Sequence, residues 1–466
     1  MLEAVAQDQR PRLWRQEVVA TLKLGWPLIL GNFAQNMLTL ADLILLGWIG
    51  SRALGAGALA TNLYFATFIF GIGVTAAVSP LLAEELGRKR HSVREVRRTV
   101  RQGLWVSVSI TLPIWLILWN GEALLLAIGQ EPELARDAGH YLRALQWSVL
   151  PGLGFLVLRQ FLAARERPGW ALAIQLAALP LNVGLAWALM FGHGGLPALG
   201  MVGAGVATSV VSTLVFAAAA AVVTIDRRFR RYYLFGRFWR ADWPRFRKLW
   251  RIGLPIGCAL AFEVTIFTGA TFVMGQLGAN ELAAHAIALQ IAAASFMVPL
   301  GLGQAATVRV GLFYGAGEPA GVSRAGWAAF GLTMAYMSTT AIILMAFPHA
   351  LVGVFLPAEQ AGNQAVLSLA ATYLLFAAMF QLFDGAQVVA AGMLRGLQDT
   401  RSPMIIAGVG YWLVGAPLGV ALAFLTPLRG SGIWIGLAAG LAAVAIALVI
   451  RWAQRERLGL LNLPSG

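Results

Sequence analysis

Long apolar runs alternate with short polar stretches along almost the whole chain of 466 residues. About 20 helical residues are enough to cross the ~30 Å hydrocarbon core of a bilayer, where a helix satisfies its own backbone polar groups. The pattern therefore predicts twelve transmembrane helices. We place them at residues 21–47, 53–80, 98–120, 140–164, 170–192, 200–224, 250–278, 281–312, 325–347, 366–394, 403–425 and 430–453.

Composition supports an all-α, polytopic membrane protein. Hydrophobic residues make up 59% of the chain and charged residues 12%, against about 25% charged residues in a typical soluble domain. The first twenty residues are polar and basic, so we expect no cleaved signal peptide. The single cysteine, Cys258, excludes an intrachain disulfide.

The net charge of +14 has a one-sided distribution. If both termini are cytoplasmic, the tails and the loops on that side hold 31 of the 35 Lys and Arg residues, including clusters at 88–98 and 226–251. This asymmetry predicts a multi-pass membrane protein with cytoplasmic N- and C-termini. We interpret the basic clusters as topology determinants that contact membrane lipids, and we expect no nucleic-acid partner.

An internal repeat organises the chain. In one constant register, without gaps, Gly25 and Pro27 match Gly253 and Pro255, and the same register continues to Gly87 and Gly315. Two six-helix halves of the same orientation follow, related by a pseudo-twofold axis along the membrane normal, with a cleft that alternates its access. The predicted organisation is a cytoplasmic tail (1–20), an N-lobe (21–225), a basic linker (226–249), a C-lobe (250–453) and a second cytoplasmic tail (454–466).

Three carboxylates lie well inside predicted spans: Asp42, Glu263 and Asp384. A charge at that depth costs roughly 2.5–3.5 kcal/mol on insertion scales. We expect no Lys or Arg at comparable depth to neutralise them, so they bind either a proton or a small cation. Both states make them candidate coupling sites for H⁺ or Na⁺, with Glu263 and Asp384 as the candidate Na⁺ ligands. The alternative is a permanently protonated acid that serves as a hydrogen-bond donor.

Other polar and aromatic residues in the spans are candidates for a cavity lining. Gln35 lies seven residues before Asp42, and Gln387 three residues after Asp384, so each shares a helix face with its carboxylate. Interhelical hydrogen bonding is the alternative role for the polar members, and an interfacial belt for the aromatic ones. The remaining candidates are Asn62, Tyr64, Asn182, Phe267, Gln290 and Phe380.

Enzyme chemistry finds no support in the sequence. The chain has no GxxxxGK[ST] loop, no GxGxxG that opens a βαβ unit, and no HExxH or CxxC spacing. We therefore predict no catalytic residue and no cofactor, and expect that an ion gradient drives any transport.

Several stretches in both halves resemble the multidrug and toxic compound extrusion (MATE) transporters, most closely their bacterial NorM-like branch. FEVTIF followed by DGAQVVAAGMLRG is the most specific combination. The matching stretches are ADLILLG (41–47), GIGVTAAVSPLLAEELG (71–87), PLNVGLAWALMFG (180–192), FEVTIF (262–267), AAHAIALQ (283–290), RVGLFYGAGEPAGVSRAG (309–326) and DGAQVVAAGMLRG (384–396).

The resemblance implies twelve helices in two bundles, and multidrug efflux by antiport of amphipathic cationic compounds against Na⁺ or H⁺. It places Glu263 and Asp384 in a C-lobe cation site and Asp42 in an N-lobe site. The chain departs from this family at two positions, each of which leaves a site with fewer polar groups. Relatives often carry tyrosine at the place of Phe380 and a second asparagine at the place of Ala186. The resemblance also implies the bacterial inner membrane, where we expect a monomer.

Two other interpretations stay open. Related folds flip lipid-linked saccharides or export other endogenous metabolites, but a pyrophosphate group calls for clustered Arg or Lys at membrane depth. The second interpretation is a membrane enzyme, or a scaffold without transport activity. A membrane enzyme is expected to carry clusters of acidic and His residues in a loop, and the sequence has no such clusters.

Overall fold

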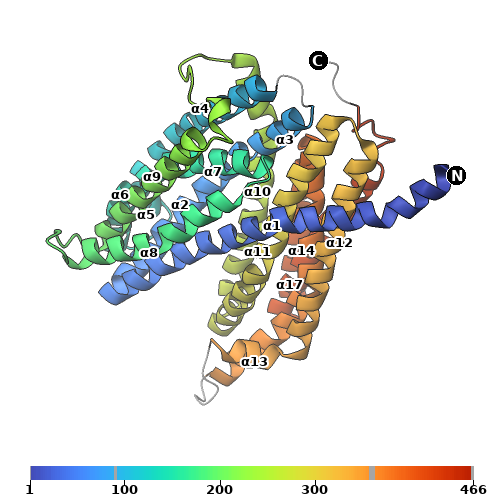
Figure 1. Cartoon of the computed structure of the whole chain (residues 1–466). Helices are drawn as coiled ribbons and strands as arrows, with labels where there is room; N and C mark the ends of the chain where they lie inside the picture. Colours follow the sequence, from blue (N-terminus) through green and yellow to red (C-terminus); the bar gives the residue numbers. More distant parts are fainter. Residues whose placement is uncertain (1, 89–91, 356–362, 463–466) are drawn as a thin grey trace. The chain divides into compact units, whose positions relative to one another are not determined.

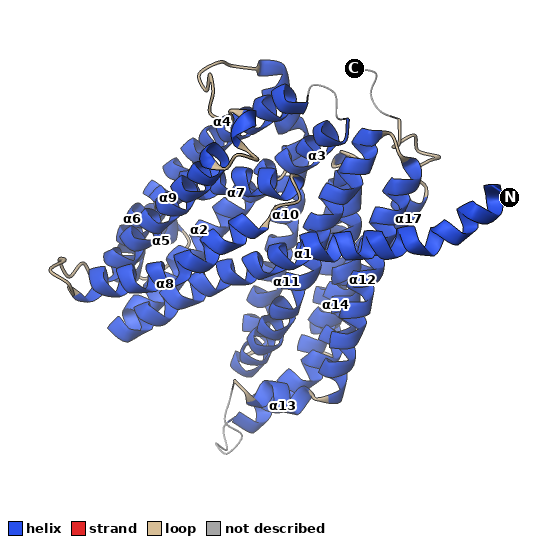
Figure 2. Cartoon of the chain, in the orientation of Figure 1, coloured by secondary structure: helices blue, strands red, loops and turns tan. Residues whose placement is uncertain are grey.

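The computed structural model describes residues 2–88, 92–355 and 363–462. Every regular element in these ranges is helical, without a strand (Figure 2). Twelve helical segments are long and apolar enough to cross a membrane, which confirms the predicted number of spans. The last four residues of the predicted C-terminal tail, and residues 89–91 of the first basic cluster, lie outside the described residues.

Nine of the twelve described spans are single helices, and three are interrupted. The single helices are α1 (Leu2–Ile49), α4 (Ser92–Trp119), α8 (Gly169–Phe191), α9 (Met201–Ile225), α10 (Trp243–Leu277), α11 (Ala279–Ala316), α12 (Pro319–Ala346), α14 (Gln364–Gly396) and α17 (Gly430–Ala453). The interrupted spans are α2 (Ser51–Thr75) with α3 (Val78–Arg88); α6 (Pro132–Leu145) with η1 (Gln146–Ser148) and α7 (Val149–Ala164); and α15 (Arg401–Gly408) with the π-helical η4 (Val409–Gly415) and α16 (Ala416–Leu425). Short helices outside the spans are α5 (Gly121–Ala127), η2 (Arg230–Tyr232) and α13 (Pro348–Gly353).

The helices pack into two compact units, which we call the first unit (Leu30–Gly257) and the second unit (Met1–Ile29 with Cys258–Gly466). In the first unit α9 packs against α6, α7 and α8, and in the second α14 packs against α11, α12 and α17 (Figure 1). Each boundary between the units falls inside a continuous helix, after Ile29 in α1 and after Gly257 in α10. The repeat register aligns Ile29 with Gly257, so both boundaries fall at the same position of the repeat.

Backbone conformation repeats in the same register. Gly50 precedes α2 with φ 147° and ψ 168°, and Gly278 precedes α11 with φ 148° and ψ 164°. Positive φ of this kind strains any residue with a β-carbon, so glycine is required at both helix starts. The two halves therefore turn between their first and second spans in the same way.

Close helix packing repeats as well. In the first unit α10 crosses α2 so closely that a β-carbon added at Gly73 would lie 2.4 Å from Gly257 Cα. In the second unit α1 crosses α11 at the equivalent residues, and a β-carbon at Gly301 would lie 2.9 Å from Ile29 N. Small residues permit such backbone approach between membrane helices. The predicted pseudo-symmetry of two six-helix halves is confirmed at this level of detail.

A buried ion pair binds the early part of each of these helices to its unit. In the second unit two of the three guanidinium nitrogens of Arg309 donate to Glu17, Nε at 2.8 Å and Nη2 at 2.7 Å. In the first unit Arg245 Nη1 lies 3.0 Å from Glu85 Oε1. Glu17 and Arg245 occupy equivalent positions of the repeat, whereas their partners Arg309 and Glu85 do not, so each half places an ion pair at this point of its first helix with a partner of its own.

The basic linker predicted at 226–249 is docked on the first unit. Tyr232 is buried against Phe161, with ring centroids 5.3 Å apart, and Arg97 Nε on α4 donates to the Tyr232 carbonyl at 2.6 Å. Trp105 Nε1, also on α4, donates to the Phe238 carbonyl at 3.0 Å. Side chains of α4 thus hold the backbone of the linker in place.

Candidate functional site

In the second unit, two of the three predicted carboxylates meet around one amide. Asp384 and Gln387 are both buried on α14, one turn apart, and Gln387 Nε2 donates to Asp384 Oδ1 at 3.3 Å. The Gln387 side chain also hydrogen-bonds Glu263, which is half-buried on α10. The charges of the two carboxylates act on each other directly. The site thus concentrates two acids and an amide between α10 and α14.

Within the described residues, neither Glu263 nor Asp384 forms an ion pair. The sequence predicted that no Lys or Arg at comparable depth would neutralise them, but a basic side chain near the end of α14 does act on one of them. Arg395, in the last turn of α14, lies near enough to Glu263 for its positive charge to act on the carboxylate. The sequence interpretation missed it because the predicted span ended at residue 394, one residue too early. Arg395 partly balances the local charge but is not bonded to either acid.

Asp42 stands in a separate network within the first unit. The carboxylate is buried on α1 and accepts two hydrogen bonds, one at each oxygen. Asn182 Nδ2 on α8 donates to Oδ1 at 2.6 Å, and Thr208 Oγ1 on α9 donates to Oδ2 at 2.8 Å. Asn182 was predicted as a site residue, whereas Thr208 was not, because α9 carries several hydroxyl side chains and the sequence does not distinguish one of them.

Gln35 and Asp42 lie on one face of α1, because both are hydrogen-bonded to residues of the same neighbouring helix, α8. Gln35 Oε1 accepts from Gln175 Nε2 on α8 at 3.5 Å, one step of seven residues before the Asp42–Asn182 contact. Beside this ladder Arg159 Nη2 on α7 donates to Asn32 Oδ1 at 2.7 Å, and both side chains are buried. Arg159 is a second basic group among the spans that the sequence interpretation did not single out. The α1–α8 face is thus polar over two turns.

The aromatic candidates divide between the two units. In the second unit Phe267 and Phe380 pack edge to face at 5.8 Å, and Phe380 packs against Trp434 at 5.5 Å. In the first unit Tyr64 is buried, stacks on Phe68 at 5.2 Å and hydrogen-bonds Ser148 Oγ at 2.8 Å. The rings of Phe267 and Phe380 therefore lie beside the Glu263–Asp384 pair on the same two helices.

Two predicted polar residues are exposed. Asn62 on α2 and Gln290 on α11 occupy equivalent positions of the repeat, and neither side chain makes a hydrogen bond within the described part of the chain. Their position does not bring them into either carboxylate network.

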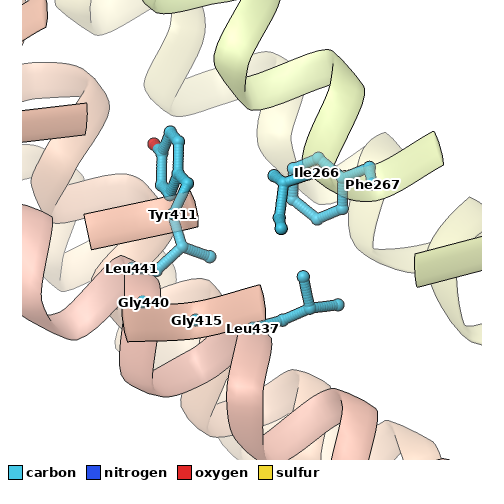
Figure 3. Close-up of a pocket in the computed structure, with 7 residues that line it drawn as sticks. All are labelled: Ile266, Phe267, Tyr411, Gly415, Leu437, Gly440 and Leu441. Atoms are coloured by element: carbon cyan, nitrogen blue, oxygen red, sulfur yellow. The ribbon is translucent and has the colours of Figure 1, made fainter. Parts of the chain in front are cut away.

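A small apolar pocket opens beside Phe267 in the second unit (Figure 3). Ile266 and Phe267 line one side, and the ring of Tyr411 faces them from η4. The remaining lining residues are Gly415, Leu437, Gly440 and Leu441.

Comparison with known proteins identifies the family to which the chain belongs. The model of the MatE family matches residues 27–188 and 255–421, two segments whose first residues are aligned by the internal repeat. A probable multidrug resistance protein NorM from Mesorhizobium japonicum is 57% identical over 446 residues, which cover 96% of each chain. Another from Brucella suis biovar 1 is 49% identical over 439 residues, covering 94% of this chain and 93% of the relative.

The chain belongs to the MATE family. Solved MATE structures share its fold at low sequence identity. The eukaryotic transporter AtDTX14 superposes with a TM-score of 0.84 at 20% identity, covering 96% of this chain and 99% of that one. A mutant of the Vibrio cholerae transporter VcmN reaches 0.86 at 15% identity over the same shares.

Membership of the MATE family confirms three predictions from the sequence. The chain is a transporter rather than an enzyme, it has the two-bundle all-α fold, and it belongs to the NorM-like branch. It is a multi-pass membrane protein of bacterial type.

Proposed function

We propose that this MATE transporter is a cation-coupled antiporter that exports amphipathic cationic compounds by alternating access, with Na⁺ or H⁺ as the coupling ion. The observation that carries the proposal is the Glu263–Gln387–Asp384 cluster. Two carboxylates share one amide donor without an ion pair in the described residues. Such a site gains most from a cation or a proton that cancels the mutual repulsion.

The relatives support the direction and the class of cargo. Both relatives compared above are named as probable multidrug resistance proteins, and the likeness extends over nearly the whole chain. A transporter that confers drug resistance moves its substrates out of the cell. Clustered negative charge with Phe267 and Phe380 beside it suits a cationic, aromatic compound, because aromatic faces attract cations.

In the proposed coupling, the ion and the cationic substrate compete for the negative charge of Glu263 and Asp384. Na⁺ or H⁺ from outside binds at these two carboxylates and displaces the substrate. The ion shifts the conformational equilibrium only by its difference in affinity for the two states. Nearly complete reversal, from 1:99 to 99:1, needs about a 10⁴-fold difference. A site of one buried and one half-buried acid is suited to a large difference, because desolvation makes an unoccupied pair costly.

Asp42 is the proposed third coupling residue, in the first unit. Its two hydrogen bonds, from Asn182 and Thr208, hold the carboxylate in one orientation, and bonds to a charged acceptor are stronger than those between neutral groups. We place it in ion or substrate binding, separately from the Glu263–Asp384 pair.

The proposed location is the bacterial inner membrane, with both termini in the cytoplasm and a monomer as the working unit. The four basic residues outside the cytoplasmic set are Arg52, Arg136, Arg143 and Arg429, and all but Arg136 are ion-paired to acids. The cytoplasmic linker instead presents exposed guanidinium groups together with the exposed rings of Tyr233 and Trp239. We propose that it contacts anionic lipid headgroups. The exposed arginines are Arg227, Arg228, Arg230, Arg231, Arg237, Arg240 and Arg247.

Efflux of ethidium from cells tests the proposal. The variants Glu263→Gln and Asp384→Asn keep size and hydrogen bonding but remove the charge, so each is expected to abolish efflux while the protein still inserts. Glu456→Gln is the matched control, because this carboxylate is 71% exposed on the surface. Efflux at the wild-type rate in both test variants would reject the proposed mechanism. Efflux absent from the wild type as well would favour export of an endogenous or lipid-linked compound.

A further inference from the structure

Tyr411 lies in an unusual part of the fold. It belongs to η4, a π-helical stretch of seven residues between α15 and α16 in a membrane span. A π-helical turn widens the backbone spiral and rarely persists unless packing or function stabilises it; such turns occur often at functional sites. From this stretch the ring of Tyr411 lines the small pocket across from Ile266 and Phe267 of α10 (Figure 3).

The hydroxyl of Tyr411 is buried without a hydrogen-bond partner in the described residues. The residue as a whole is only 3% exposed. A buried polar group that has lost its water costs free energy unless something binds it, so an orphan hydroxyl at this depth requires an explanation. Packing of the ring explains the presence of an aromatic residue but not of its oxygen.

Tyr411 lies near the part of α10 that carries Glu263, because it lines one pocket with Ile266 and Phe267. Gly408, three residues earlier, packs so closely on Phe262 that a β-carbon there would lie 3.2 Å from the ring. Glu263 follows Phe262 and stands one turn before Ile266, which places it on the same side of α10 as the pocket lining. The negative charges of Glu263 and Asp384 both act on the Tyr411 hydroxyl.

We propose that Tyr411 supplies a third oxygen ligand to Na⁺ at the Glu263–Asp384 pair and thereby makes the site select Na⁺. The inference rests on the proposed function and refines it. Na⁺ is a hard cation that takes several oxygen ligands, as Ca²⁺ and Mg²⁺ do, whereas a proton needs only one carboxylate oxygen. The phenol keeps its proton and offers a lone pair, while the two carboxylates balance the charge of the ion.

Tyr411→Phe isolates the oxygen, because the ring and its contacts with Ile266 and Phe267 remain. The matched control is Tyr373→Phe, another buried tyrosine of the second unit. It lies eleven residues before Asp384 on α14, roughly 16 Å along the helix. Purified proteins in detergent are titrated with NaCl by calorimetry, with KCl as the competing salt and the thermal midpoint as the check on folding.

The expected result is at least a roughly tenfold loss of Na⁺ affinity and of Na⁺-over-K⁺ selectivity in Tyr411→Phe, with Tyr373→Phe at the wild-type value. Wild-type affinity and selectivity in Tyr411→Phe would overturn the inference. So would a wild type that binds no Na⁺, although proton coupling would then leave the proposed function standing. Glu263→Gln in the same titration separates the two levels: if it binds Na⁺ as the wild type does, the proposed cation site itself is wrong.

Discussion

The ion pair between Glu17 and Arg309 gives the sharpest stability prediction. Both hydrogen bonds are short, and the side chains of Glu17 and Arg309 are only 5% and 13% exposed. Removal of one partner therefore leaves the charge of the other largely shielded from water. Breaking a buried pair costs about 3–5 kcal/mol. Because Arg309 retains some exposure and packs on Phe313 at 5.2 Å, we expect a loss of about 3 kcal/mol for Glu17→Gln.

A double-mutant cycle measures the pair directly. Glu17→Gln, Arg309→Gln and the double variant are unfolded by titration with a denaturing detergent. The double variant is expected to lose about 2 kcal/mol less than the two single losses together, because no charge is left unpaired. The exchanged pair Glu17→Arg with Arg309→Glu is expected to recover most of the stability, since the equivalent position of the repeat already carries an ion-paired arginine, Arg245. Additive losses, with no recovery on exchange, would refute this account of the anchor.

Single contacts give two further predictions. Gly73→Ala puts a methyl group 2.4 Å from the Gly257 backbone, which cannot yield, so we expect about 1–3 kcal/mol of destabilisation, whereas Gly331→Ala, with open space around it, is neutral or stabilising. Equal thermal midpoints for these two variants would contradict the close crossing. Thr208→Val removes one donor to Asp42 and is expected to raise the cation concentration for half-maximal efflux several-fold, whereas Thr213→Val removes only a bond to a backbone carbonyl and serves as the control. Identical cation dependence in both would exclude a role for the Thr208 hydroxyl.

Much of the fold was predictable because a bilayer leaves few choices. Apolar length determines the spans, and the ungapped register of the repeat predicted the pseudo-symmetry. The structure adds the paired conformations of Gly50 and Gly278, which follow the same register. Which helices pack against each other was harder to predict from the sequence. The sequence does not show that the early parts of α1 and α10 pack in different units from their later parts, because one continuous apolar helix looks the same in either arrangement.

The candidate site shows the same division. A carboxylate inside an apolar transmembrane span is easy to recognise in a sequence, so Asp42, Glu263 and Asp384 were predicted as candidates from their charge alone. Their partners were not, because a hydroxyl such as that of Thr208 satisfies itself on its own helix as readily as it bonds a neighbour. Tyr411 was overlooked for another reason: its orientation depends on a π-helical turn that apolar periodicity does not reveal.

Ion-driven transport by the purified protein tests the central claim most directly. Wild type, Glu263→Gln and Asp384→Asn are reconstituted in liposomes, a fluorescent cation is loaded, and an opposing Na⁺ or pH gradient is imposed. We predict that at least one gradient drives accumulation or release by the wild type and that neither gradient does so in either variant. Gradient-driven movement of the cation that persists in both variants would contradict the account.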